Sequence, residues 1–126
     1  MGFEVKITDE AFADLDVIAE FIKRKASVDI ARTWLAAILN TIESLREMPG
    51  RCPLAPESEE IEDEIRFLLH GRKNRTYKIY FKIHHTTASG GSVQVFHVRH
   101  WARRPIDADE LEDLMEDDSE FGNENE

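Results

Sequence analysis

Apolar and polar positions alternate at the start of the chain and then change to a helical period. Residues 3–7 (FEVKI) show the two-residue period of a half-buried strand. From Asp9 to about Lys25, apolar side chains recur at spacings of three and four, and the Thr8 hydroxyl can cap this helix. Its apolar positions are Phe12, Leu15, Ile18, Ala19 and Ile22. The pattern predicts a strand followed by an amphipathic helix.

A second helical pattern follows after a short linker. Ser27 or Asp29 can cap this helix. We expect it to run to about Met48, because Pro49 and Gly50 follow. One face carries Ala31, Trp34, Leu35, Ile38, Ile42 and Leu45. The short linker makes the two helices an antiparallel hairpin, and the apolar side of each needs a further layer.

Three strand-like runs in the C-terminal half provide that layer. We expect strands at residues 65–70, 76–85 and 92–100, with turns at residues 71–74 and 88–91. The order β-α-α-β-β-β predicts an α+β fold, in which an antiparallel sheet carries an α-helical hairpin on one face. The other face of the sheet would be free.

Length and composition predict one domain, residues 1–106, and an acidic tail, residues 107–126. The tail contains eleven Asp and Glu and no Lys or Arg. We expect a short helix at about residues 107–117 and disorder after it. Cys52 is the only cysteine, so no internal disulfide can form. Without a signal-peptide pattern or a run of about 18 apolar residues, we expect a soluble, cytoplasmic protein that does not contact membranes.

The charge of the chain is divided between segments. The net charge is −10 and the pI is about 4.9, values that normally disfavour nucleic acid as a partner. Residues 66–106, however, hold all five histidines and no acidic residue. The nine basic residues there are Arg66, Arg72, Lys73, Arg75, Lys78, Lys82, Arg99, Arg103 and Arg104. The acidity therefore belongs mainly to the tail.

Alternation along the strands predicts that much of this charge shares one surface. We expect the following side chains to face away from the helices: Arg66, His70, Lys78, Tyr80, Lys82 and His84. Cations neutralise phosphates, and an exposed tyrosine ring provides a surface on which an unpaired base stacks. Single-stranded nucleic acid is one partner of such a surface. The alternative is a solvated sheet face, paired with the acidic tail.

The histidines suggest acid–base chemistry rather than metal binding. His84 and His85 point to opposite faces and have no acidic neighbours in sequence, so we expect no metal site and no cofactor. RNA cleavage by its own 2′-hydroxyl needs a proton acceptor, a proton donor and cations. The candidates are His100 with Arg99 and Arg103, and Lys78 or Arg66 across the sheet. A structural role for His100 is the alternative.

The order and spacing of residues over about positions 3–105 resemble the RelE/ParE superfamily of toxins from type II toxin–antitoxin systems. The residues that carry the resemblance are Ala13-Asp14-Leu15, Ile18, Phe21-Ile22, Ala31, Trp34, Ile42-x-x-Leu45-x-x-x-Pro49, Ile65-Arg66, Leu69, Gly71, Tyr77-Lys78-Ile79, Val95 and Val98-Arg99-His100. The resemblance implies the same sheet-and-hairpin fold and growth arrest through a nucleic-acid-linked target. It also implies a cognate antitoxin encoded alongside.

Two activities are known in that superfamily: ParE-like poisoning of DNA gyrase, and RelE-like cleavage of mRNA on the ribosome. For the RelE-like activity, the resemblance implies the catalytic residues Arg66, Lys78, His100 and Arg103. The tyrosine of the RelE pattern falls near Asp107 instead, and no tyrosine follows Arg104.

The resemblance therefore favours the ParE branch and gyrase inhibition, with mRNA cleavage as the alternative. A degenerate member that only binds its antitoxin is a third reading. The candidate target- or nucleic-acid-binding residues are Arg72, Lys73, Arg75, Tyr80, Lys82, Arg99 and Arg104.

Overall fold

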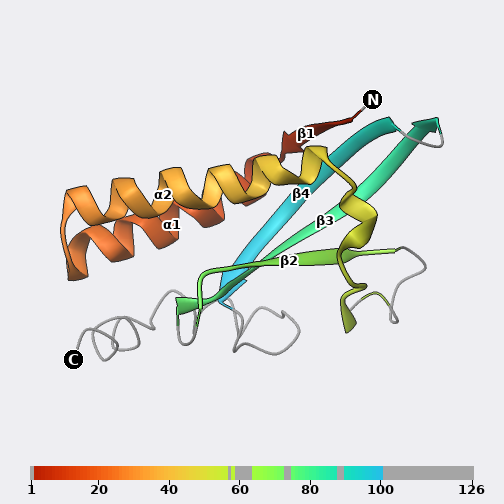
Figure 1. Ribbon diagram of the computed structural model, residues 1–126. Coiled ribbons are helices and arrows are strands. Elements are labelled where there is room, and N and C mark those ends of the chain that lie inside the picture. Colours follow the sequence, from red (N-terminus) through yellow and green to blue (C-terminus); the bar gives the residue numbers. More distant parts are fainter. Residues whose placement is uncertain (1, 57, 59–63, 73–74, 88–89, 101–126) are drawn as a thin grey trace.

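The computed structural model describes residues 2–56, 58, 64–72, 75–87 and 90–100. Its elements are β1 (Phe3–Ile7), α1 (Asp9–Lys25), α2 (Val28–Glu43), two short 3-10 helices (Ser44–Arg46 and Pro49–Arg51), β2 (Arg66–His70), β3 (Tyr77–Thr87) and β4 (Gly90–His100). This order confirms the predicted α+β arrangement (Figure 1). The predicted acidic tail lies outside the described residues.

The four strands form one sheet in the order β1-β4-β3-β2. β2 pairs antiparallel with β3, and β3 pairs antiparallel with β4, as the sequence predicts. β1 lies parallel to β4, with Phe3 opposite Gly91 and Ile7 opposite Val95. The sheet is therefore mixed, and its first strand in sequence lies beside its last.

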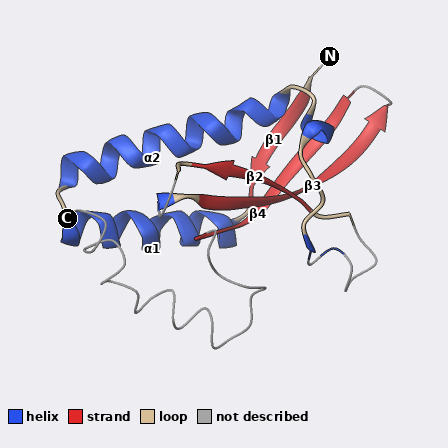
Figure 2. Ribbon diagram, turned by 60° about the horizontal axis from the view of Figure 1, so that its bottom comes forward, coloured by secondary structure: helices blue, strands red, loops and turns tan. Residues whose placement is uncertain are grey.

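Both helices begin at the hydroxyl residues that the sequence offers as caps. The Thr8 hydroxyl accepts the backbone N–H of Ala11 at 3.2 Å. The Ser27 hydroxyl accepts that of Ile30 at 3.1 Å, so Ser27 rather than Asp29 caps α2. Figures 1 and 2 show the two helices side by side, as the hairpin prediction requires. These hydroxyls satisfy backbone donors that the first helical turn leaves open.

The second helix ends earlier than the sequence predicts. α2 stops at Glu43, and one 3-10 turn, Ser44–Arg46, continues it. Met48, the predicted end, has a φ of 49°, in the left-handed region. A residue in that conformation cannot extend a right-handed helix, so the prediction was about five residues too long.

The main core lies between the helical hairpin and one face of the sheet. Its buried members are Phe3, Ala11, Leu15, Ile18, Ile22, Ala31, Ile38, Ile42, Leu45, Cys52, Tyr77, Ile79, Phe81, Val93, Val95 and Val98. Phe12, predicted to lie in this core, is 46% exposed, and the smaller Ala11 is buried in its place. The rest of the predicted face is confirmed, since Leu15, Ile18 and Ile22 are buried.

The opposite face of the sheet, called the outer face below, is partly covered. A second cluster there joins Ala55 and Ile65 with the buried Tyr80, and Phe67 and Phe96 pack against it. The expectation of a free face was wrong, because the loop before β2 folds across it. That loop is anchored by an antiparallel bridge between Leu54 and Arg66.

Beyond the end of β1, the edge of β4 is closed by a side chain of α1. β1 ends opposite Val95, whereas β4 continues to His100. The Asp14 carboxylate accepts the Val98 backbone N–H at 3.0 Å and lies 2.7 Å from His97 Nδ1. These bonds fix α1 to the sheet.

In the described part of the chain, no helix has the length and apolar character needed to cross a membrane.

Candidate functional site

Arg66 lies on the helix side of the sheet, not on the outer face as predicted. Its guanidinium donates to the carbonyl of Cys52 at 2.6 Å and to that of Gly50 at 3.4 Å. The Glu64 carboxylate lies 3.6 Å from the same guanidinium. Arg66 therefore holds the loop that follows the helices, and its charge has partners in the protein.

His70 also faces the helices, which contradicts the predicted facing of β2. Its Nδ1 lies 2.8 Å from the hydroxyl of Thr41 on α2, and burial lowers the pKa of His70. The reason is Leu68, which shares the parity of Arg66 and His70 and packs against the main core. Phe67 and Leu69 consequently take the outer face.

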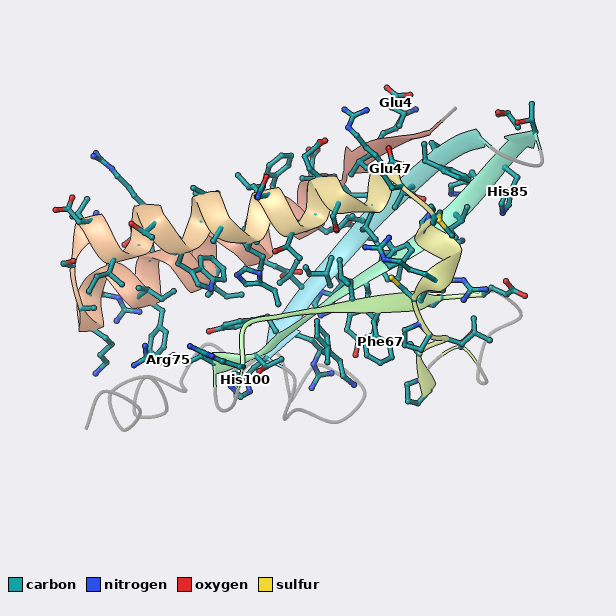
Figure 3. All side chains as sticks on the ribbon, in the orientation of Figure 1. Glu4, Glu47, Phe67, Arg75, His85 and His100 are labelled. Carbon is teal, nitrogen blue, oxygen red and sulfur yellow. The ribbon has the colours of Figure 1, made fainter. Side chains whose placement is uncertain are left out.

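His100 is buried within the aromatic part of the main core. Its ring centroid lies 5.5 Å from that of Tyr77, in an edge-to-face arrangement. Tyr77 contacts Trp34 of α2 in the same manner at 5.4 Å. His100 thus lies on the helix side of the sheet, at the lower end of β4 in Figure 3. Arg103, its proposed neighbour, lies outside the described residues.

Lys78 and Arg99 lie opposite each other in the register of β3 and β4, on the outer face. The Lys78 ammonium is 5.0 Å from the centre of the Phe67 ring, within the range of a cation–π contact. Arg99 is buried. Of the described candidates for acid–base work, namely Arg66, Lys78, Arg99 and His100, only Lys78 and Arg99 lie at paired positions on one face.

The remaining candidates for catalysis are separated. Arg66 pairs with Phe81 and His100 with Tyr77, four residues apart on β3. At the rise of a β-strand this is about 13 Å. General acid–base catalysis needs groups within about 3 Å of one substrate. The described residues do not bring Arg66, His100 and Lys78 to one phosphate.

The binding candidates divide in a similar way. Arg72 and Arg75 are exposed around the turn between β2 and β3, and Lys82 is half-buried. Tyr80, predicted to be an exposed stacking surface, is buried under Ala55 and Ile65. Lys73 and Arg104 lie outside the described part. The cationic turn therefore persists, whereas the aromatic platform does not.

Two residues that the sequence reasoning did not select, Phe67 and Leu69, occupy the outer face beside Lys78. The signal was present in residues 66–70 (RFLLH), where both parities contain an apolar residue. Such a strand is covered on one face and presents apolar side chains on the other. Among the described side chains, no group of three or more His, Cys, Asp or Glu is placed to hold a metal ion.

Comparison with known proteins places the chain in a family. The family model described as "ParE toxin of type II toxin-antitoxin system, parDE" matches residues 5–105. A solved structure titled "Chromosomal ParDE TA system from P. aeruginosa" aligns with a TM-score of 0.61 and 17% sequence identity. The alignment covers 78% of this chain and 95% of that one, which supports the same fold. A search of curated proteins gave no match. On the strength of the family match, the chain belongs to the ParE toxins of type II toxin–antitoxin systems.

Proposed function

We propose that this toxin arrests growth by binding and inhibiting DNA gyrase, without chemistry of its own. The observation that carries this choice is the separation of the candidate catalytic residues of the alternative. Arg66 and His100 face the helices, and Lys78 faces the opposite side of the sheet. A nuclease needs these groups at one phosphate, whereas an inhibitor needs only a surface that fits its target.

The environment of each candidate also favours binding over catalysis. Arg66 donates to two backbone carbonyls, and His100 is buried against an aromatic ring. Both side chains therefore have structural roles in the fold. RelE-like cleavage of mRNA is the second candidate function, and it rests on the cationic composition of residues 66–106.

We further propose that the toxin acts in the cytoplasm and is held inactive by a cognate antitoxin. The similar structure is titled as a ParDE system, which is what suggests such a partner. Exposed apolar side chains on the helical hairpin, Phe12, Val28 and Ile30, provide surface that a protein partner would cover.

The test is induced expression followed by two measurements. Gyrase inhibition predicts accumulation of cleaved gyrase–DNA complexes in cells and loss of supercoiling activity with purified components. Position-specific mRNA breaks would instead support the nuclease. The absence of both effects would support a member that only binds its antitoxin. Co-expression of a short neighbouring reading frame should restore growth if that frame encodes the antitoxin.

The nuclease alternative has its own test. A variant with His100→Ala and Arg103→Ala should lose any mRNA breaks if these residues are catalytic. Undiminished cleavage by a folded double variant would refute that assignment.

A further inference from the structure

A small surface on β2 and β3 combines an exposed leucine with a half-buried phenylalanine and a half-buried lysine. We call it the β2–β3 patch and define it as Phe67, Leu69 and Lys78. Leu69 is 49% exposed and lies opposite Lys78 in the register of the two strands. The Lys78 ammonium lies over the Phe67 ring at 5.0 Å. Figure 3 shows Phe67 extending from β2 on the side away from the helices.

The surroundings of the patch are positively charged. Arg72 and Arg75, both exposed, flank the turn that joins β2 to β3. Residues 66–106 contain no Asp or Glu, so no acidic side chain of these strands offsets the charge. An apolar centre with a cationic rim is complementary to an acidic protein surface that contributes an apolar side chain.

The backbone beside the patch also suits a polypeptide. The loop before β2 pairs with the outer edge of that strand: the Ala55 N–H donates to Ile65 and the Phe67 N–H donates to Pro53. Alternation along an antiparallel strand directs the backbone groups of Leu69 to this same edge. Within the described residues, the pairing of the loop does not extend to Leu69.

We propose that the β2–β3 patch is the surface by which the toxin holds its protein target, through an extended acidic segment that places an apolar side chain against Leu69. This inference rests on the proposed function, and the segment belongs to gyrase. The edge backbone at Leu69 adds hydrogen bonds to the segment, as in strand addition to a sheet edge.

Two other occupants fit the patch less well. Single-stranded nucleic acid needs an open aromatic face, but Tyr80 is buried and one side of the Phe67 ring is taken by Lys78. A second copy of the chain would bring the same cationic rim against itself, and like charges directly opposite destabilise strand pairing.

The experiment compares full-length variants in gyrase supercoiling and gyrase-binding assays with purified proteins. Leu69→Asp and Lys78→Glu remove the apolar anchor and reverse the charge of the patch. Leu54→Asp is the matched control, because Leu54 is as exposed as Leu69, at 49%. Its bridge to Arg66 places it on the helix side of the sheet, away from the patch. Lys25→Glu, at the exposed end of α1, controls for charge reversal. Circular dichroism and thermal unfolding verify that each variant is folded.

We expect each patch variant to inhibit gyrase at least tenfold more weakly than the wild type, and each control to stay within twofold. Patch variants that inhibit like the wild type, or a Leu54→Asp variant that loses as much, would overturn the assignment while leaving the proposed function standing. A wild-type chain that neither binds nor inhibits gyrase would overturn both. Equal loss of binding to a single-stranded oligonucleotide, or a change in oligomeric state, would assign the patch to those occupants and overturn the proposal.

Discussion

The Asp14 carboxylate accepts a backbone hydrogen bond at the edge of β4, where β1 has already ended. Asp14 accepts the Val98 N–H that a longer β1 would have paired, and it also bonds His97. The side chains of Asp14 and His97 are both mostly buried, at 16% and 17% exposure. Removing the carboxylate therefore leaves two donors without an acceptor and little water to replace it.

Asp14→Ala should lower the free energy of unfolding by about 1–3 kcal/mol, the usual cost of buried donors that lose their acceptor. Urea denaturation followed by circular dichroism measures this. Asp16→Ala is the control, since Asp16 is exposed on the same helix, and a change within about 0.5 kcal/mol is expected there. Equal losses in the two variants would remove the special role of Asp14.

His70 makes the stability of the fold depend on pH. Burial lowers its pKa below the ordinary 6.5, so the unfolded chain binds the proton more readily than the folded one. Its contribution to stability is complete above pH 6.5 and is lost as the pH falls below 6.5 and through the lower pKa of the folded state. The thermal midpoint should fall between pH 7.5 and 5.5, and His70→Gln should reduce that fall.

His84→Gln is the control for the pH series, because His84 is exposed and bonds the Gln94 side chain on the neighbouring strand. It should retain the wild-type pH dependence. If His70→Gln and wild type lose stability in parallel, the protonation of His70 is not the cause.

At the scale of elements, the turn between β2 and β3 depends on a glycine. Gly71 has a φ of 95°, and a Cβ there would overlap the backbone oxygen of Arg75. Gly71→Ala should destabilise the fold by about 1–3 kcal/mol, because the side chain adds strain and forces the turn to open. Gly50→Ala, where a Cβ would meet nothing within 4 Å, should change stability by less than about 0.5 kcal/mol. Thermal unfolding distinguishes the two, and similar midpoints would contradict the steric argument.

Local signals predicted the first elements well. Period, caps and linker length located β1, α1 and the start of α2 correctly, because each depends on neighbouring residues alone. The facing of β2 was wrong because a strand with apolar residues on both parities has no single buried side. Tertiary contacts decide the facing: Leu68 packs against the main core, and His70 contacts Thr41 of α2.

The candidate site was harder to predict than the fold. The cover over Tyr80 comes from a loop whose path no periodicity encodes. The parallel pairing of β1 with β4 joins distant parts of the chain and has no local signature either. Composition shows that residues 66–106 are rich in basic residues, but the distribution of these residues over the two faces required the register of the sheet.

At the scale of the whole molecule, the acidic tail carries the net negative charge of the chain. Without residues 107–126, the chain holds 16 basic and 15 acidic residues (26 minus 11), and its net charge changes from −10 to +1. Deleting the tail should strengthen binding to the target, or to a nucleic acid, at low ionic strength and have little effect at high salt. Binding titrations at both salt concentrations measure this.

A full-length chain with the tail carboxylates replaced by amides is the matched control for the deletion. It should bind like the truncated chain if charge is the cause. Binding that neither variant changes would show that the tail has no masking role.

The position of β1 beside β4 has a consequence for when the toxin can form. The pairing of Phe3 with Gly91 spans 88 residues, since 91 − 3 = 88. At about 5–20 residues per second of synthesis, the first strand waits roughly 4–18 s for its partner. Until then its hydrogen-bonding edge and the apolar face of α1 have no sheet to join. The four-stranded sheet can therefore form only after residues 90–100 have been synthesised, and we expect a copy truncated before β4 to lack this fold.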